Sequence, residues 1–398
     1  MQDNKRDTMK VYIITPTTFP FGLADTNRII YYAKMLIECG IHIEVVIYKR
    51  NNDYGNYQPK GQIDGIPFRY VGGRVDRSHN KLISRYFDCT DRLSLAYYLL
   101  RVLQPGDCVL CYGSLYTSII PRVVHLNKSK FVFNLCELPH VVENESWKSR
   151  FLREQFGRRV LAHSDGAITI TEGLTVFAKQ YLPQRAEILK VPILVDYFKC
   201  NMKDESESST IPYIFHAGAL SESKDGFLGM VEAFGIACKE IKSPFHFYST
   251  GTIEKCPHRE AFEKLTEQYD LKDKFFFTGY LTEEQLQSRL REARLVIINK
   301  YKSLQNQYCF SSKLAEYMAA SKPIITTNVG EAMLWIKNNH DALIVEPEDV
   351  YELARAILKI HSDDDYRCML GNNANQSCKE YFDYRNYKEL LTNYLLTI

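Results

Sequence analysis

Short apolar runs rich in β-branched residues alternate along the chain with longer stretches of helical periodicity. The clearest example opens the fold, with a strand over 11–15, a helix from about Asp25 to Cys39 and a second strand over 43–48. Further strand-like runs of the first half lie near 108–112, 131–135, 167–170 and 188–191. Because strands that alternate with helices form parallel sheets, this pattern predicts an α/β fold.

A polar interruption, NMKDESESST at 201–210, separates this series from a second one that begins at Tyr213. In the second series we expect further strands near 245–249, 275–278, 295–298, 324–327 and 343–345, each followed by a helix. A length of 398 residues favours two domains, so we expect two doubly wound, Rossmann-like domains facing across a cleft. Ligands of such sheets bind at the carboxyl ends of the strands, which places the expected site between the domains. The expected segments are a disordered tail (1–8), a first domain (9–200), a linker (201–210), a second domain (211–380) and a crossover segment (381–398). The crossover segment should contain a last helix of about 384–396, with an apolar stripe of Tyr387, Leu390, Leu391 and Tyr394.

The composition excludes some classes of protein. Fifty basic residues against 48 acidic ones give a net charge of +2, so no global field favours nucleic acid. No apolar run is long enough to span a bilayer, and the start MQDNKRDT has no apolar signal region, which favours a cytoplasmic location. Eleven scattered cysteines fit reduced thiols better than a disulfide framework.

The segment FSSKLAEYMAASKPIITTNVGE, at 310–331, predicts an anion site. Ser311 or Ser312 would cap a short helix whose first amide groups, including that of Lys313, remain available to a ligand. Glu316 lies one residue too far along for a capping box, and its carboxylate would lie beside the anion site. Such a carboxylate could accept hydrogen bonds from a ribose, so the segment suggests a nucleoside diphosphate. A solvated surface glutamate is the alternative.

Gly218 and Lys224, in HAGALSESKDG, follow the first strand of the second domain. A glycine lets a ligand approach the backbone, and a lysine there can place its charge on a phosphate. Together with the segment at 311–316, they would supply cation and amides to a nucleotide-sugar diphosphate. Read alone, Lys224 is an ordinary surface lysine.

Two positions in the first domain are candidates for the sugar side. Glu137 follows a strand and precedes Pro139, where its carboxylate could hold sugar hydroxyls or be a loop surface residue. Gly22 lies in the first loop, where it could allow the donor to pass or only permit a turn. That loop lacks the GxGxxG fingerprint, which disfavours a nicotinamide cofactor.

The stretch WKSRFLREQFGRRV, from Trp147, mixes five basic residues with aromatic ones. Such a helix can rest on an anionic membrane surface through 147–159. We favour the alternative, a helix that packs by one face and is solvated on the other.

In the order and spacing of these motifs, the chain from Met9 to its end resembles the GT-B nucleotide-sugar glycosyltransferases, particularly glycosyltransferase family 4 (group 1). The resemblance rests on Gly218 with Lys224, on FSSKLAEYMAASKPIIT, on NVGE at 328–331, and on DALIVEPED followed by YFDYRNYKELL. It implies a donor of the UDP- or GDP-sugar type held by the C-terminal domain, an acceptor held by the N-terminal domain, and a last helix that crosses back to the first domain. It further implies no cofactor or metal. Together with the basic stretch at 147–159, the resemblance points to a lipid-linked or polysaccharide acceptor at the inner face of the membrane, with a soluble acceptor as the alternative.

Three positions depart from the family pattern. Tyr308 stands where a glutamate often meets the transferred sugar, Ala219 replaces a common phosphate-binding arginine, and Cys136 replaces a histidine of the first-domain cleft. These departures leave changed specificity and lost activity as alternatives.

The resulting hypothesis is a retaining glycosyltransferase that moves a sugar from a nucleoside-diphosphate sugar to a glycan acceptor. We assign catalysis to Lys224 and Glu137. The assigned donor-binding residues are Gly22, Gly218, Lys224, Ser311, Ser312, Lys313, Leu314 and Glu316. The alternatives are a non-catalytic scaffold of the same fold and, less favoured, a nucleotide-sugar epimerase.

Overall fold

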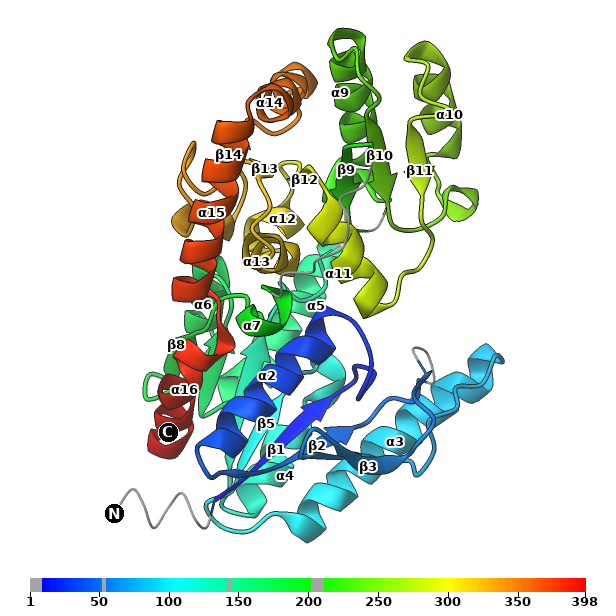
Figure 1. Cartoon of the computed structure of the whole chain (residues 1–398). Coiled ribbons are helices and arrows are strands. Elements are labelled where there is room, and N and C mark those ends of the chain that lie inside the picture. The colour runs from blue at the N-terminus through cyan, green and yellow to red at the C-terminus, as the bar shows by residue number, and fades with distance from the viewer. Residues whose placement is uncertain (1–8, 52–54, 142–144, 202–210, 219) are drawn as a thin grey trace. The chain divides into compact units, whose positions relative to one another are not determined.

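The computed structural model describes residues 9–51, 55–141, 145–201, 211–218 and 220–398, and these form two compact units (Figure 1). Unit 1 comprises the described residues up to Pro192 together with 384–398, and unit 2 comprises those of 193–383. The expected tail over 1–8, and the expected linker beyond Asn201, lie outside the described residues. The division falls before the expected end of the first domain, because the Tyr197 hydroxyl donates to Asn375 Oδ1 of unit 2 at 2.7 Å.

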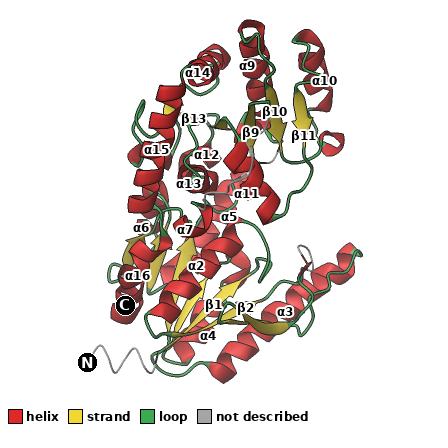
Figure 2. Cartoon of the chain, viewed as in Figure 1, coloured by secondary structure: helices red, strands yellow, loops and turns green. Residues whose placement is uncertain are grey.

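Unit 1 contains, among its described residues, an eight-stranded sheet in the order β3-β4-β2-β1-β5-β6-β7-β8. Its strands are β1 (Lys10–Thr15), β2 (His42–Ile47), β3 (Lys60–Ile63), β4 (Ile66–Tyr70), β5 (Cys108–Cys111), β6 (Lys130–Leu135), β7 (Gly166–Thr169) and β8 (Glu187–Lys190). Its α-helices are α2 (Ala24–Glu38), α3 (Lys81–Val102), α4 (Ile120–Leu126), α5 (Trp147–Arg159), α6 (Glu172–Lys179) and α16 (Lys388–Thr397) (Figure 2).

The described neighbours in this sheet run parallel except for the edge pair β3–β4, which is an antiparallel hairpin. Asp64 and Gly65 form its two-residue turn, and both have a positive φ, of 48° and 80°. This is the backbone that a type I′ turn requires. The sequence does not predict this hairpin, because β3 is half exposed and has no apolar alternation.

The end of the chain packs on unit 1, which confirms the expected return of the last helix. The ring of Tyr384 stacks on that of Tyr31 of α2 at 5.2 Å. The Tyr394 hydroxyl of α16 donates to the carbonyl oxygens of Ala167 and Glu187, at 3.1 and 2.8 Å. The helix starts later than expected, because 384–387 form a 3₁₀ turn, and Leu390, expected in its apolar stripe, is 48% exposed.

Unit 2 contains, in its described part, a six-stranded sheet in the order β11-β10-β9-β12-β13-β14. Its strands, all parallel to their neighbours, are β9 (Tyr213–His216), β10 (His246–Ser249), β11 (Phe275–Phe277), β12 (Leu295–Ile298), β13 (Ile324–Thr327) and β14 (Leu343–Val345). Its α-helices are α7 (Tyr197–Cys200), α8 (Glu222–Asp225), α9 (Phe227–Glu240), α10 (Arg259–Gln268), α11 (Glu283–Glu292), α12 (Leu304–Tyr308), α13 (Ser312–Ala319), α14 (Val350–Ser362) and α15 (Asp364–Tyr381).

The core of unit 2 contains a cluster of phenylalanine rings. Phe234 of α9 contacts Phe247 and Phe275 of adjacent strands edge to face, and those two rings stack at 4.6 Å. Aromatic contacts of this kind add about 0.5–1.5 kcal/mol to area burial. They fix α9 against β10 and β11, which lie on one side of β9 in the sheet.

Candidate functional site

The sheet of unit 2 reverses its strand order at β9, because β10 pairs with one edge of β9 and β12 with the other. Doubly wound sheets bind ligands at such a switch point, outside the carboxyl ends of the strands. Among the described residues, 217–218 and 220–226 follow β9, and 299–308 follow β12. The candidate site is therefore built from these two segments and from the start of α13.

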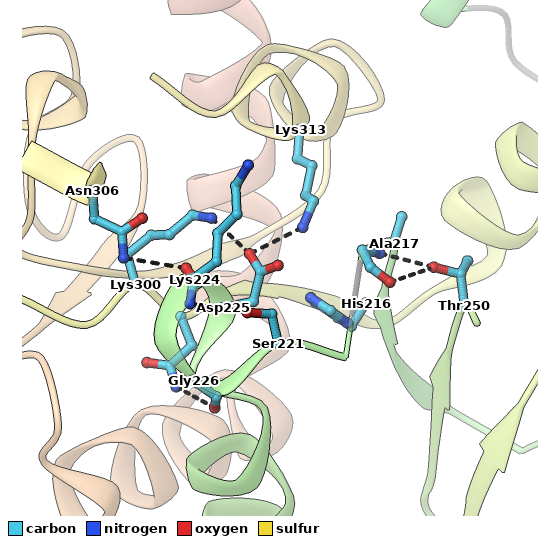
Figure 3. A network of polar contacts seen from close by, with 12 residues as sticks. His216, Ala217, Ser221, Lys224, Asp225, Gly226, Thr250, Lys300, Asn306 and Lys313 are labelled. Atoms are coloured by element: carbon cyan, nitrogen blue, oxygen red, sulfur yellow. Dashed lines mark hydrogen bonds and ion pairs between the residues drawn. The ribbon is translucent and has the colours of Figure 1, made fainter. Parts of the chain in front are cut away.

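Three charged side chains meet at this point (Figure 3). Asp225 of α8 is buried, and its Oδ1 accepts from Lys300 Nζ at 2.6 Å and lies 3.3 Å from Lys313 Nζ. Burial opposes ionisation of Asp225, but the two lysines outweigh it and lower its pKa to about 2. Two ammonium groups thus share one carboxylate, which leaves an excess of positive charge at the carboxyl ends of β9 and β12.

Lys224 adds a third cation to this cluster. Its carbonyl oxygen accepts from Asn306 Nδ2 at 3.2 Å, which fixes its backbone, and Figure 3 shows its side chain lying alongside those of Lys300 and Lys313. Burial lowers the pKa of Lys313, and the charges of Lys300 and Lys224 lower it further, against the opposing effect of Asp225. An anion bound here would relieve this repulsion between cations.

Gly218 lies directly beneath the Lys313 side chain. A Cβ built on Gly218 would collide with Lys313 Nζ and would lie 2.9 Å from the His216 ring. The amide of Gly218 donates to Thr250 Oγ1 at 2.8 Å, so this backbone is held in place. Burial lowers the pKa of His216 to about 3, and the imidazole is therefore neutral. In this structure, Gly218 permits the close approach of the Lys313 side chain.

The first amide groups of α13 do not donate to the side chain of its N-cap residue. Ser311 precedes the helix, and its side chain makes no capping hydrogen bond. The amide of Leu314 donates to the Ser311 carbonyl at 3.1 Å, and the Leu314 side chain is buried. Leu314 therefore contributes packing to this turn, whereas Ser312 and Lys313 provide its leading amides.

Glu316 is half-buried on α13, one turn after Lys313. Burial raises its pKa to about 7, although the nearby Lys313 charge acts in the opposite direction. A carboxyl group whose charge is costly in the free protein is a strong acceptor for hydroxyl donors of a ligand.

Asn306 is a site residue that the sequence analysis missed. It is 2% exposed, and its Nδ2 lies within hydrogen-bond distance of the carbonyl oxygens of Ser223, Lys224 and Tyr301. Rotating the amide would set its oxygen against three carbonyl oxygens, so the orientation is determined. Asn306 Oδ1 has no hydrogen-bond partner among the described residues, and Asn306 lines a small pocket together with Lys300, Phe310 and Ser311. The pocket therefore contains a fixed acceptor atom.

The other residues assigned from the sequence lie in unit 1. Glu137 is exposed in the loop after β6, at the carboxyl end of the sheet. Gly22 follows β1, and a Cβ there would collide with the hydroxyl groups of Thr18 and Thr26, so the packing of this loop already requires glycine. Burial raises the pKa of Cys136 to about 12, so this residue is a neutral thiol. Ala219 lies outside the described residues.

Arg28 is a second residue that the sequence did not single out. It is buried in α2, and its guanidinium donates to the carbonyl oxygens of Val191 and Pro192, at 2.8 and 2.6 Å, and to the Tyr32 hydroxyl. It thereby ties α2 to the segment that leaves β8. Its Nε has no partner among the described residues, which leaves one buried donor at the carboxyl end of this sheet.

The basic stretch at 147–159 forms α5, as a helix that packs by one face. Phe156 is buried against Phe133 of β6 with ring centroids 5.1 Å apart, whereas Trp147 and Phe151 are exposed. Arg158 pairs with Glu154 of the same helix at 2.6 Å. No helix in the described part of the chain is long and apolar enough to cross a membrane.

The fold of the chain matches that of solved structures over nearly its whole length. Sucrose-phosphate synthase from Thermosynechococcus elongatus is 14% identical, with a TM-score of 0.72 over 97% of this chain and 98% of that one. Anabaena Alr3699/HepE, solved with UDP and glucose, is 13% identical, with a TM-score of 0.73 over 98% and 100%. These likenesses show the fold, which is the GT-B type with two Rossmann-like domains.

In sequence, the second half of the chain is similar to glycosyltransferases. Residues 199–377 match the family described as Glycosyl transferases group 1. The lipopolysaccharide core biosynthesis glycosyltransferase LpsD of Rhizobium meliloti is 27% identical over 160 residues, which are 40% of this chain and 42% of LpsD. The chain is therefore similar to less than half the length of this relative.

Proposed function

We propose that the protein is a retaining glycosyltransferase, which moves a sugar from a nucleoside-diphosphate sugar to a glycan acceptor without a metal ion. The observation that carries the proposal is the cluster of Lys224, Lys300 and Lys313 around one carboxylate at the switch point of unit 2. A diphosphate carries the negative charge that would balance the excess positive charge of this cluster. The match of 199–377 to the glycosyltransferase family, and the binding of UDP by Alr3699/HepE, support this choice of ligand.

The diphosphate would be bound by the Lys224 and Lys313 side chains and by the leading amides of α13. Amides at a helix N-terminus and ammonium groups both favour a negatively charged ligand. Asp225 holds Lys313, and Lys300 neutralises Asp225, so the carboxylate does not repel the phosphates. The ribose hydroxyls would donate to Glu316.

Transfer would proceed as the bond between the anomeric carbon and the diphosphate oxygen breaks. The acceptor oxygen bonds to the anomeric carbon on the face from which the diphosphate departs, and its proton passes to the departing phosphate oxygen. The negative charge that develops on the diphosphate is stabilised by Lys224, Lys313 and the helix amides. We assign Glu137 to holding sugar hydroxyls of the acceptor, which we propose to be a polysaccharide or lipid-linked glycan.

The titration of Glu316 gives a test of nucleotide-sugar binding. The folded carboxyl has its pKa raised to about 7, so raising the pH from 6 to 8 ionises it in the free protein. If the ribose donates to the carboxylate, affinity for UDP-glucose or GDP-mannose should rise by up to about tenfold over this range. Intact nucleotide sugars are used because their diphosphate does not itself titrate in this interval.

The matched variant is Glu316→Gln, which keeps the shape of the side chain and removes its charge. We expect calorimetric titration to show about tenfold weaker binding at pH 8 and no dependence on pH. Equal affinity of the variant and the native protein at pH 8 would remove Glu316 from the binding site.

A further inference from the structure

Helix α3 of unit 1 carries an exposed apolar stripe. Leu82, Tyr86, Leu93, Tyr97 and Leu100 recur at intervals of four, seven, four and three residues, so they share one face of the helix. Their exposed fractions are 74, 65, 69, 62 and 46%. The stripe extends over about 27 Å of helix length. Soluble proteins rarely expose a continuous apolar patch of this length unless it contacts a partner.

The opposite face of α3 anchors the helix to unit 1. Leu95 and Leu99 are buried, and the Tyr98 hydroxyl donates to Glu44 Oε2 of β2 at 2.8 Å. The exposed stripe is therefore distinct from the core-facing side of the helix, which is the side that carries Leu95 and Leu99. Figure 1 shows α3, in cyan, with its first turns lying beyond the strands of unit 1.

The charged side chains of α3 that remain available to a partner are all basic. The helix contains Lys81, Arg85, Arg92 and Arg101, and its acidic residues are Asp88 and Asp91. Both acids are neutralised from outside the helix, Asp88 by Arg77 at 3.1 Å and Asp91 by Arg50 at 2.8 Å. Basic side chains therefore flank the stripe, whereas both acidic residues of the helix are already paired with arginines.

We propose that α3 docks on an anionic membrane surface, with the leucine and tyrosine side chains at the level of the lipid headgroups and the basic residues on lipid phosphates. An apolar stripe bordered by cations is the pattern of a helix that lies in the membrane interface. A second copy of the chain fits less well, because pairing two α3 helices would bring their basic residues together without acids to balance them. The surface is separate from α5, which the sequence pattern had suggested for this role.

Vesicle co-sedimentation of the full chain tests this proposal. We expect binding to phosphatidylcholine vesicles that contain phosphatidylglycerol, weakening with salt, and little binding to phosphatidylcholine alone. Changing Leu82→Glu together with Tyr97→Glu should weaken binding to the anionic vesicles at least about tenfold. The matched control is Leu126→Glu with Tyr351→Glu, which alters equally exposed residues on α4 and α14 and should bind as the native protein does.

Circular dichroism and thermal melting of both double variants would show that each is folded, since the changed side chains are exposed. The proposal is overturned if the α3 variant binds as well as the control, or if binding is lost on changing Trp147→Glu and Phe151→Glu of α5 instead. It is also overturned if sedimentation shows a dimer of the native protein that the α3 variant disperses.

Discussion

Lys224→Ala should lower the turnover of the nucleotide sugar by about a hundredfold or more, with the fold intact. The expected loss is that of a preorganised charge aimed at the departing diphosphate, where negative charge develops during bond cleavage. Lys313→Ala should have a comparable effect, because its ammonium group lies over Gly218 in the same cluster. Release of nucleoside diphosphate under donor saturation, measured for each variant, gives the comparison.

The matched control is Lys264→Ala, on the exposed side of α10 in the same unit. It removes one positive charge from unit 2 and should leave turnover unchanged, which separates a local effect from a change in net charge. Turnover of Lys224→Ala within a few fold of the native rate would remove Lys224 from the reaction.

Asp225→Asn should destabilise unit 2 by about 3–5 kcal/mol, because it leaves two lysines in a buried site without a countercharge. The folded pKa of Asp225 is about 2, below its ordinary value of 3.8. Its stabilising contribution is therefore complete above about pH 4 and is lost as the pH falls towards 2. The stability of Asp225→Asn should therefore not show this loss as the pH falls.

The two tryptophans allow the unfolding of unit 2 to be followed by itself. Trp335 lies in unit 2, and Trp147 is exposed in unit 1, so Trp147→Phe leaves a fluorescence probe of unit 2 alone. Urea unfolding of Asp225→Asn in this background is compared with that of Asp270→Asn, whose side chain is 96% exposed and should change stability by less than about 0.5 kcal/mol. Equal midpoints for the two variants would show that the Asp225 ion pairs do not stabilise the fold.

Local patterns were enough to predict most of the strands of unit 2. The expected strands at 295–298, 324–327 and 343–345 coincide with β12, β13 and β14, since each is a short apolar run bounded by polar residues. The same reasoning missed the β3–β4 hairpin, whose first strand is half exposed and whose stability comes from pairing at the sheet edge. Local periodicity carries no signal for such a strand.

The candidate site was predicted in part, for a similar reason. The glycine, lysine and helix-start motifs are local, and they identified Gly218, Lys224 and the start of α13. The partners of Asp225 are 75 and 88 residues away in sequence, and they meet only because β9 and β12 are neighbours in the sheet. Lys300 lies two residues after the expected strand at 295–298, so the rule that ligands bind at carboxyl ends of strands could have marked it as a candidate. Asn306 required the structure, because its role depends on three carbonyl oxygens that converge on it.

The central claim is that the lysine cluster of unit 2 serves the cleavage of a nucleoside-diphosphate sugar at the anomeric carbon. The most direct measurement is the identity of the nucleotide released from UDP-glucose or GDP-mannose by the full chain, with water as the acceptor. The account predicts slow release of UDP or GDP. Binding of these donors without release of a nucleotide would indicate a non-catalytic scaffold. Release of the nucleoside monophosphate would indicate cleavage within the diphosphate. Either result would contradict the account.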